Sequence, residues 1–272
     1  MDELILCVAP VPGDNQEERF PGQMDVVAEV VRCHGAGASI VHLHVRDEQG
    51  RQSADPSFFQ GQVQQIRATT PIIVEGSTGG TPEHTLEERS VAIMVPGIEM
   101  GSLNMGSINM AGGVYQNPMG EIRFYALEMV KRKIKPSLCI FDLSMLFNVT
   151  RLETEGLLGG PLVYNLIFDV PDTIPFSHRV LDIFVSQLPE GALWFLTRHH
   201  APGSSGFQDA LERGGHVRVG YEDGPFLSTG KRARSNAELV EEIAGVARQT
   251  GRKVVDPERA REILGIVKGN RL

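Results

Sequence analysis

Cysteine is scarce in this chain, and the few that occur lie far apart. The 272 residues include three, Cys7, Cys33 and Cys139, and no two have the short spacing of a redox or metal-binding pair. This excludes a disulfide-rich scaffold and a cysteine-based zinc site. The N-terminus also lacks the basic region and apolar stretch of a signal peptide, so we expect a reduced, cytoplasmic protein.

Basic blocks and long apolar runs are missing as well. The chain has 26 Lys and Arg against 34 Asp and Glu, a formal net charge of -8. This balance argues against a general binder of nucleic acids or membrane surfaces. The densest basic cluster, Lys131 to Lys135, falls at a predicted helix end, where cations are favoured anyway. No apolar run approaches the roughly 18 residues that cross a bilayer, which leaves small molecules as the expected partners.

Several motifs of nucleotide binding and nucleophilic catalysis are absent too. The sequence contains no phosphate-binding Gly-X4-Gly-Lys-Ser/Thr loop and no Gly-X-Ser-X-Gly turn. The first apolar run, residues 4–9, leads into PVPGDN, whereas an open doubly wound sheet would carry Gly-X-Gly-X-X-Gly there. That architecture is therefore our second choice.

Short apolar runs alternate with helix-like segments along the chain. The strand-like runs are residues 4–9, 39–45, 71–77, 98–104, 137–143, 161–170, 192–198 and 216–222. The helical patterns are residues 24–34, 56–69, 82–94, 120–134, 144–156 and 235–251, with further candidates after the sixth and seventh strands. Eight such units predict an α/β fold, a closed (β/α)8 TIM barrel spanning residues 1–272 as a single domain, with an extra C-terminal helix at residues 257–267.

In such barrels the chemistry gathers where the strands end. The residues just past the predicted strand cores are Asp14, His42, His44, Arg46, Glu75, Ser77, Ser102, Asn104, Cys139, Asp142, Arg198, Arg218, Glu222 and Asp223. We expect these side chains to converge on one mouth of the barrel.

Two histidines are the most informative of these residues. His42 and His44 stand two positions apart in the apolar, β-branched run SIVHLHV. Successive strand side chains alternate between faces, so both imidazoles project from one face and are close enough to bind one metal ion. The alternative is a structural pair with hydrogen-bond partners. Three nitrogen and oxygen ligands with an open fourth position would fit catalytic zinc, with manganese, iron and cobalt as other options.

The segment GGHVRVGYEDG, residues 214–224, offers a carboxylate for the same site. Glu222 and Asp223 are adjacent, so at a strand end they would point in different directions. One could then bind the metal while the other engages Arg218 or a reacting proton. The alternative is a solvated turn, because residues 220–225 are rich in turn formers.

Polar loops after other strands suggest an anion site. STGG, residues 77–80, presents amides and hydroxyls to an anion such as a substrate carboxylate, or simply makes a tight turn. GSLNMGSIN, residues 101–109, has small and polar residues that suit either close ligand approach or loop packing. RHHAPG, residues 198–203, adds histidines that either line the mouth or lie on the surface.

Over nearly its full length, the chain resembles the beta-keto acid cleavage enzyme family. The segments that carry the resemblance are AGASIVHLHVRDEQGRQSAD, STGG, GSLNMGSIN, GGHVRVGYEDG, SNAELVEEI and DPERAREIL. The resemblance implies a zinc-dependent (β/α)8 barrel, usually a homotetramer. Such enzymes exchange acyl groups between a β-keto acid and acetyl-CoA, giving acetoacetate and a new acyl-CoA.

The resemblance also implies roles for individual residues. The metal ligands would be His42, His44 and Glu222. Arg218 and Asp223 would form the polar pair that assists the carbon–carbon bond chemistry. The residues expected to hold the carboxylate of the keto acid are Ser77, Gly80, Ser102 and Asn104.

The chain departs from the family pattern on its fifth strand. Members usually read Pro-Glu-X-Glu there, and this chain has Ser137 and Cys139 at the two glutamate positions. Glu75, on the third strand where members often carry Gln, is our candidate for the missing catalytic carboxylate. Asp14 falls in the loop that is expected to select the far end of the substrate. Residues 198–203 replace a glycine-rich segment, which would alter how CoA is seated.

Two other functions stay open from the sequence. A His-X-His strand also occurs in metal-dependent hydrolases of the amidohydrolase type, although those usually carry the pair on their first strand. A non-catalytic binding homologue would result if the changes at Ser137 and Cys139 removed turnover.

Overall fold

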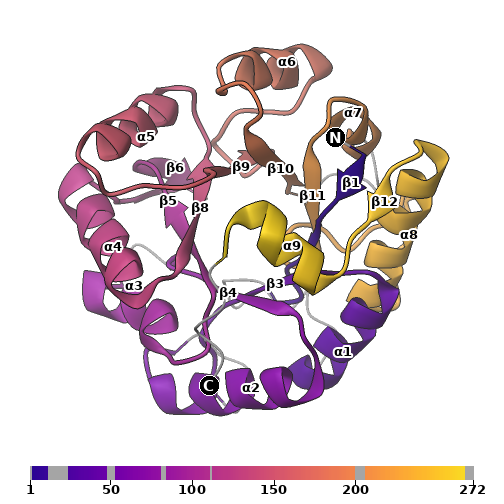
Figure 1. Ribbon diagram of the computed structural model, residues 1–272, viewed down its shortest axis with the longest axis horizontal. Helices are drawn as coiled ribbons and strands as arrows, with labels where there is room; N and C mark the ends of the chain where they lie inside the picture. Colours follow the sequence, from indigo (N-terminus) through magenta and orange to yellow (C-terminus); the bar gives the residue numbers. More distant parts are fainter. Residues whose placement is uncertain are drawn as a thin grey trace.

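Parallel strands close into a barrel at the centre of the molecule (Figure 1). The structure, a computed structural model, describes residues 2–11, 24–47, 53–80, 84–110, 112–199 and 206–266. The barrel strands in chain order are β2 (Leu6–Val8), β3 (Ile40–Leu43), β4 (Ile73–Gly76), β5 (Met100–Asn104), β8 (Lys135–Ile140), β9 (Val163–Phe168), β10 (Leu193–Arg198) and β11 (His216–Val219). Pairing of β11 with β2 closes the sheet. The predicted (β/α)8 barrel is confirmed.

Helices between successive strands form the outer ring (Figure 1). They are α1 (Val26–Ala36), α2 (Pro56–Thr69), α3 (Leu86–Met94), α4 (Met119–Arg132), α5 (Ser144–Thr154), α6 (His178–Ser186), α7 (Phe207–Glu212) and α8 (Asn236–Gln249). The bounds of α2 match the prediction, because Asp55 caps the helix by accepting from the Ser57 N–H at 2.8 Å and Pro56 suits the first turn. Among the described residues, no helix has the length and apolar character needed to cross a membrane.

The start of α3 differs from our prediction. We expected a helix from Pro82, and the described helix begins at Leu86, while residues 81–83 lie outside the described part of the chain. Thr85 accepts from the N–H of Glu88 at 3.2 Å, and the Glu88 carboxylate accepts from the N–H of Thr85 at 2.8 Å. This reciprocal capping box satisfies two amides that the helix itself leaves unpaired.

Two short pairings were not predicted. The expected strand at residues 4–9 is wrong in extent, because it divides into β1 (Glu3–Leu4), which pairs with β12 (Lys253–Val254), and the barrel strand β2. The polar segment after β5 contains β6 (Ile108–Met110), which forms an antiparallel hairpin with β7 (Gly113–Tyr115).

The extra C-terminal helix, α9 (Pro257–Leu264), lies across the amino-terminal end of the barrel (Figure 1). It buries Ala260 and Leu264 against an inner apolar layer. That layer is formed by Ile5, Cys7, Ile40, Ile73, Met100, Val163, Leu193 and Phe195. Burial of this layer closes one end of the barrel, which leaves the carboxyl-terminal end for ligands.

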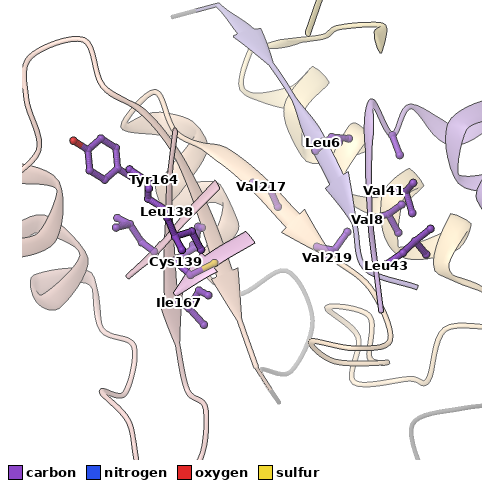
Figure 2. Packing of buried hydrophobic residues seen from close by; sticks show 14 of the residues in the cluster. Leu6, Val8, Val41, Leu43, Leu138, Cys139, Tyr164, Ile167, Val217 and Val219 are labelled. Atoms are coloured by element: carbon purple, nitrogen blue, oxygen red, sulfur yellow. The ribbon is translucent and has the colours of Figure 1, made fainter. Parts of the chain in front are cut away.

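Side chains alternate along each strand between an outward face, which packs against the helices, and an inward face, which lines the barrel. Outward side chains such as Val8, Val41 and Leu43 join the large core that packs against the helices (Figure 2). Inward positions two residues beyond the apolar layer carry polar groups on most strands. These are His42, Glu75, Ser102, Asn165, Thr197 and Arg218, with Ser137 and Cys139 on β8. The interior therefore changes from apolar to polar toward the carboxyl ends of the strands.

Candidate active site

The two histidines lie side by side at the carboxyl end of β3. His42 is an inward residue of the strand, and His44 follows just after the strand ends at Leu43. Their ring centroids are 5.2 Å apart with planes at 78°, and both side chains are buried. The sequence prediction that the two rings share one face is confirmed.

Glu222 reaches these rings through a turn. We expected the strand to continue to Glu222, but β11 ends at Val219 and residues 220–223 turn. Gly220 has φ 151°, and a Cβ added there would lie 2.1 Å from the carbonyl oxygen of Ala9, so glycine is required. The N–H of Glu222 donates to this same oxygen at 3.2 Å. The alternative prediction of a turn was correct in conformation, but Glu222 is buried and not solvated.

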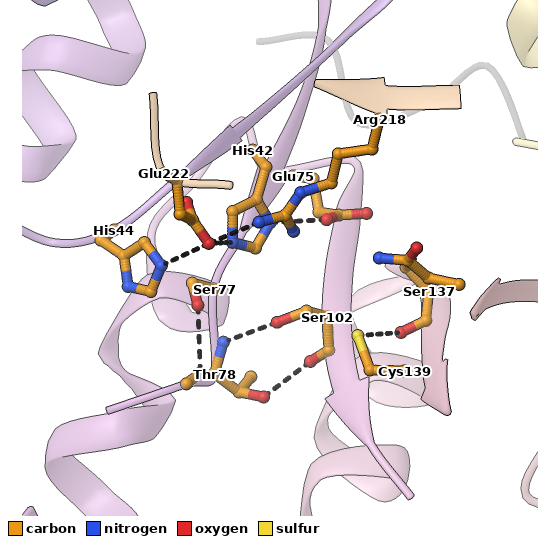
Figure 3. Close-up of polar contacts among 12 residues, drawn as sticks. His42, His44, Glu75, Ser77, Thr78, Ser102, Ser137, Cys139, Arg218 and Glu222 are labelled. Carbon is orange, nitrogen blue, oxygen red and sulfur yellow. Dashed lines mark hydrogen bonds and ion pairs between the residues drawn. The ribbon is translucent and has the colours of Figure 1, made fainter. Parts of the chain in front are cut away.

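Glu222 and the two histidines form a compact set of donor atoms (Figure 3). The Oε1 atom of Glu222 lies 3.4 Å from His44 Nε2 and 3.7 Å from His42 Nε2. One ligand atom from each residue falls within 4.8 Å of the others. Two ligands of a tetrahedral zinc, each about 2.1 Å from the ion, lie roughly 3.4 Å apart. The chemistry and spacing of the set therefore fit a divalent metal ion.

The electrostatics of the set also suit a metal. Burial lowers the pKa of His44 despite the nearby Glu222 carboxylate, so this imidazole is neutral near pH 7. Burial alone would raise the pKa of Glu222, but the Arg218 guanidinium outweighs burial and, with a hydrogen bond from His44, holds that pKa well below its usual range. A neutral imidazole and an ionised carboxylate are the forms that bind metal.

Glu75 contacts the other nitrogen of His42. Its Oε1 atom lies 2.6 Å from His42 Nδ1, and both side chains are buried. This contact orients the ring so that Nε2 faces Glu222. A catalytic role of Glu75 stays a prediction, and the direct contact of this carboxylate is with an imidazole of the donor set.

Arg218 projects from β11 toward Glu222, on the side of this carboxylate that faces away from His44 (Figure 3). Its Nη2 atom contacts Glu222 Oε1 and donates to Asp223 Oδ1 at 2.9 Å, and its Nε donates to Asp223 Oδ2 at 3.0 Å. Burial would lower the pKa of Arg218, but the two carboxylates raise it well above its usual range. A permanently charged guanidinium is thus held in a fork against Asp223.

Asp223 joins Arg218 to a further histidine. Its Oδ1 atom lies 3.4 Å from His199 Nε2, which places that histidine at the mouth and not on the outer surface. Burial raises the pKa of Asp223 to about 6 despite the opposing effect of Arg218. His200 and residues 201–205 lie outside the described part of the chain.

The loop after β4 is tied to β5 through Thr78. The Thr78 N–H donates to Ser102 Oγ at 3.0 Å, and Thr78 Oγ1 donates to the Ser102 carbonyl at 2.6 Å. The N–H of Gly79 donates to Ser77 Oγ at 3.1 Å. Both serine hydroxyls thus accept from backbone amides, so their protons are left to donate to another acceptor.

Two further predicted substrate residues, Gly80 and Asn104, lie in the described part of the chain. Gly80 lies against α3, where an added Cβ would be 3.0 Å from Arg89 Cγ, so a larger residue would have to displace this side chain. Asn104 ends β5 and is paired in register with Cys139. Asp14 lies outside the described residues.

The fifth barrel strand, β8, carries no carboxylate at the two positions that differ from the family pattern. Ser137 and Cys139 are both buried inward residues, and Cys139 Sγ donates to the Ser137 carbonyl at 3.7 Å. Burial, reinforced by Glu75, raises the pKa of Cys139 to about 12. The thiol is therefore protonated near pH 7 and acts as a neutral lining group.

Our sequence analysis missed one polar pair in the interior. Thr197 Oγ1 on β10 donates to Asn165 Oδ1 on β9 at 2.7 Å, and both residues are buried. The signal was present, since Asn165 and Thr197 interrupt otherwise apolar strands. These strands were interpreted by their overall hydrophobicity, and the two residues were not considered individually.

Comparison with models of known protein families assigns the chain to a known group of enzymes. Residues 4–266 match the model described as beta-keto acid cleavage enzyme. The chain belongs to the beta-keto acid cleavage enzyme family. The resemblance inferred from HLHVRD and GGHVRVGYED is confirmed.

Characterised members of this family are similar to the chain along most of its length. The 3-keto-5-aminohexanoate cleavage enzyme of Acetoanaerobium sticklandii is 34% identical over an alignment of 277 residues. The alignment covers 98% of this chain and 100% of that protein. The enzyme of the same name from Fusobacterium nucleatum is 32% identical, with the same coverage. The 3-oxoadipate:acetyl-CoA acetyltransferase of Cupriavidus necator is 34% identical over 85% of this chain and 82% of its own length.

A solved structure supports the fold independently. The ternary complex of ObcA with a C4-CoA adduct and oxalate superposes with a TM-score of 0.70 at 19% identity. The match covers 88% of this chain and 66% of ObcA. At this identity the likeness concerns the barrel architecture alone.

Proposed function

We propose that this protein cleaves a β-keto acid by exchanging its acyl group with acetyl-CoA, giving acetoacetate and a new acyl-CoA. The observation that carries the proposal is the buried set His42, His44 and Glu222 beside the Arg218–Asp223 pair, in a chain of this family. Acetyl-CoA is the co-substrate in the names of two relatives, the 3-oxoadipate:acetyl-CoA acetyltransferase and a 3,5-dioxohexanoate:acetyl-CoA acetone transferase.

His42, His44 and Glu222 would hold a divalent metal, which we propose to be zinc because two imidazoles and one carboxylate form a common catalytic zinc set. These residues would thereby place a Lewis acid where it could polarise a ketone. Glu75 supports the set by holding His42 through its Nδ1 atom, which fixes the ring orientation.

Arg218 would stabilise negative charge in the reaction, and Asp223 would accept a proton. Breaking a carbon–carbon bond next to a ketone places negative charge on oxygen, and the Arg218 guanidinium can stabilise it in this buried site. Asp223 orients Arg218 with two hydrogen bonds. Its carboxylate, with a pKa of about 6, can accept a proton at Oδ1 near neutral pH.

The serine hydroxyls would bind the carboxylate of the keto acid. Ser77 follows β4 and Ser102 lies within the neighbouring strand β5; both are buried, and each retains a hydroxyl proton to donate. We include Gly80 and Asn104 in the same subsite, as the family resemblance implies. Asp14 is proposed to contact the far end of the substrate.

A substrate panel tests the proposed function. Zinc-loaded protein is incubated with acetyl-CoA and cationic, anionic or apolar β-keto acids, and CoA esters are measured by mass spectrometry. We expect acetoacetate and a matching acyl-CoA from at least one keto acid. Consumption of substrate without acetyl-CoA would instead indicate a metal-dependent hydrolase, and binding without turnover would indicate a non-catalytic homologue.

We also propose that the chain forms a homotetramer, as the family resemblance implies. Apolar side chains on the outer faces of α4 and α5 support association, since Val130 is 55% and Phe147 77% exposed. Analytical ultracentrifugation of the wild type and of Phe147→Asp tests this. A wild type that sediments as a monomer would contradict it.

A further inference from the structure

The polar interior of the barrel has a charged half and an uncharged half. Along one arc of the barrel, with β2 between β11 and β3, the strands β11, β3 and β4 contribute Arg218, His42 and Glu75. On the other side, β9 and β10 contribute Asn165 and Thr197, beside the neutral groups of β8. The proposed function uses the charged half and leaves the Asn165–Thr197 pair without a role.

Asn165 faces the interior of the barrel. It lies two residues beyond Val163, which belongs to the inner apolar layer. Its in-register neighbours on the flanking strands are Cys139 and Phe195. Because it is 3% exposed, its amide lies inside the packed barrel and not at the protein surface.

Thr197 fixes the orientation of this amide. The Thr197 hydroxyl donates to Asn165 Oδ1 at 2.7 Å, and Thr197 is fully buried. With Oδ1 turned toward β10, the Nδ2 group is directed away from that strand. Within the described part of the chain, no residue accepts from Asn165 Nδ2. The two N–H groups of Nδ2 are therefore available to a ligand.

We propose that Asn165 donates a hydrogen bond to the carbonyl oxygen of the acyl-CoA thioester, and that Thr197 is the positioning residue that aims this donor. The inference rests on the proposed function for the identity of the ligand. A thioester carbonyl is uncharged in the ground state and gains negative charge when its acyl group is attacked. A preoriented neutral donor stabilises that charge without binding an anion in the resting site.

The placement of charged and neutral groups in the barrel interior indicates why the thioester oxygen is the substrate atom that accepts from Asn165. The keto group belongs beside His42, His44 and Glu222, and the substrate carboxylate belongs beside Ser77 and Ser102. The second carbonyl of the reaction needs a donor of its own, and the uncharged half supplies one. Cys139 adds no competing charge, since its thiol is protonated.

Kinetics of matched variants test the proposal. For Asn165→Ala we expect kcat to fall about 10²-fold, the cost of losing one such donor, with KM for the keto acid within about twofold. Asn165→Asp, which places an acceptor where the donor was, should be at least as impaired. Thr197→Val should lose about tenfold in kcat, and Thr197→Ser should restore it. The control is Thr70→Val, a buried threonine at the amino end of the barrel, which should leave kcat unchanged.

A spectroscopic measurement separates this proposal from the proposed function. The carbonyl stretch of bound acetyl-CoA labelled with ¹³C at the carbonyl should shift to lower frequency in the wild type and lose the shift in Asn165→Ala. A shift retained in Asn165→Ala overturns the donor role, as does a wild type that binds no thioester. If the shift depends on Asn165 while no keto acid is converted, the donor role stands and the proposed function fails.

Discussion

The two ends of the barrel both bury charged side chains, but they balance charge differently. At the amino end, Glu99 accepts from Arg261 Nε at 2.7 Å and from Arg261 Nη2 at 2.8 Å, and Arg67 Nη1 lies 3.4 Å from Glu99. Arg261 also donates to the Pro71 carbonyl at 2.8 Å. Each carboxylate oxygen there has a cationic partner, and the cluster joins α9 to α2 and to the start of β5.

At the carboxyl end, carboxylates outnumber the guanidinium that they contact. Glu222 and Asp223 share Arg218, and Glu75 contacts an imidazole. Buried carboxylates that outnumber the cation they contact are unfavourable unless a further cation compensates them. The comparison teaches that burial of charge alone does not indicate function. A saturated cluster stabilises the fold, whereas an unbalanced one marks the place for a metal and a substrate.

The largest expected effect comes from removing a metal ligand. Glu222→Gln should lose bound zinc and lower acyl exchange by roughly 10³-fold or more, because the donor set loses its charged member. His44→Ala should behave in the same way. The melting temperature of the metal-free protein should change by only a few degrees, since the packed layers lie elsewhere. Metal analysis, exchange assays and calorimetry measure the three quantities, and retention of stoichiometric zinc by both variants would contradict the site.

The matching substitution at the amino end of the barrel should lower stability without affecting zinc binding or catalysis. Glu99→Gln removes the buried counter-ion of Arg261 and leaves it only the exposed Glu258 at 3.4 Å, so we expect the free energy of unfolding to fall by about 3 kcal/mol. Zinc content and kcat of the folded fraction should be unchanged. Chemical denaturation followed by circular dichroism measures the loss. A variant that unfolds like the wild type but has lost zinc would contradict the assignment of a structural role to the amino-end cluster.

The buried histidine at the amino end provides a pH test. His216 is fully buried and its Nδ1 accepts from the Ile5 N–H at 3.2 Å, so the ring is neutral. Burial, reinforced by Arg252, lowers its pKa to about 3. The unfolded chain takes up a proton near pH 6.5 and the folded chain does not, so this contribution to stability is present above pH 6.5 and is lost as the pH falls toward 3.

We expect the free energy of unfolding to fall by roughly 2–3 kcal/mol from this group between pH 7 and pH 4.5. His216→Asn keeps an acceptor near the Nδ1 position and should remove that part of the pH dependence. Urea titrations of both proteins at several pH values measure the difference. Identical pH profiles for the two proteins would show that the ring is protonated, or exposed, in the folded state.

The smallest expected effect concerns Glu75. Glu75→Gln keeps an acceptor for His42 Nδ1 but removes its charge, so the affinity for zinc should fall about tenfold, with Glu75→Ala weaker still. Competition with a chromogenic chelator measures zinc affinity in the absence of substrate. If turnover falls steeply while zinc affinity is unchanged, Glu75 acts on the substrate, as the sequence first suggested, and does not mainly support His42.

The sequence alone predicted much of the architecture, because its signals are local. Alternation of apolar runs and helical patterns indicated the barrel, and the spacing of His42 and His44 placed both rings on one face. Strand ends were less accurate. The end of β11 depends on the contact of Gly220 with the carbonyl of Ala9, a residue from the other end of the chain.

What only the tertiary structure decided is how distant residues meet. Closure of β11 against β2, next to β3, brings Glu222 within 3.4 Å of His44. The barrel likewise turns Glu75 toward His42 and pairs Thr197 with Asn165. Sequence patterns report the face on which a side chain lies, since this follows from the backbone repeat. The partner of that side chain depends on strand order and register, which form only when the sheet closes.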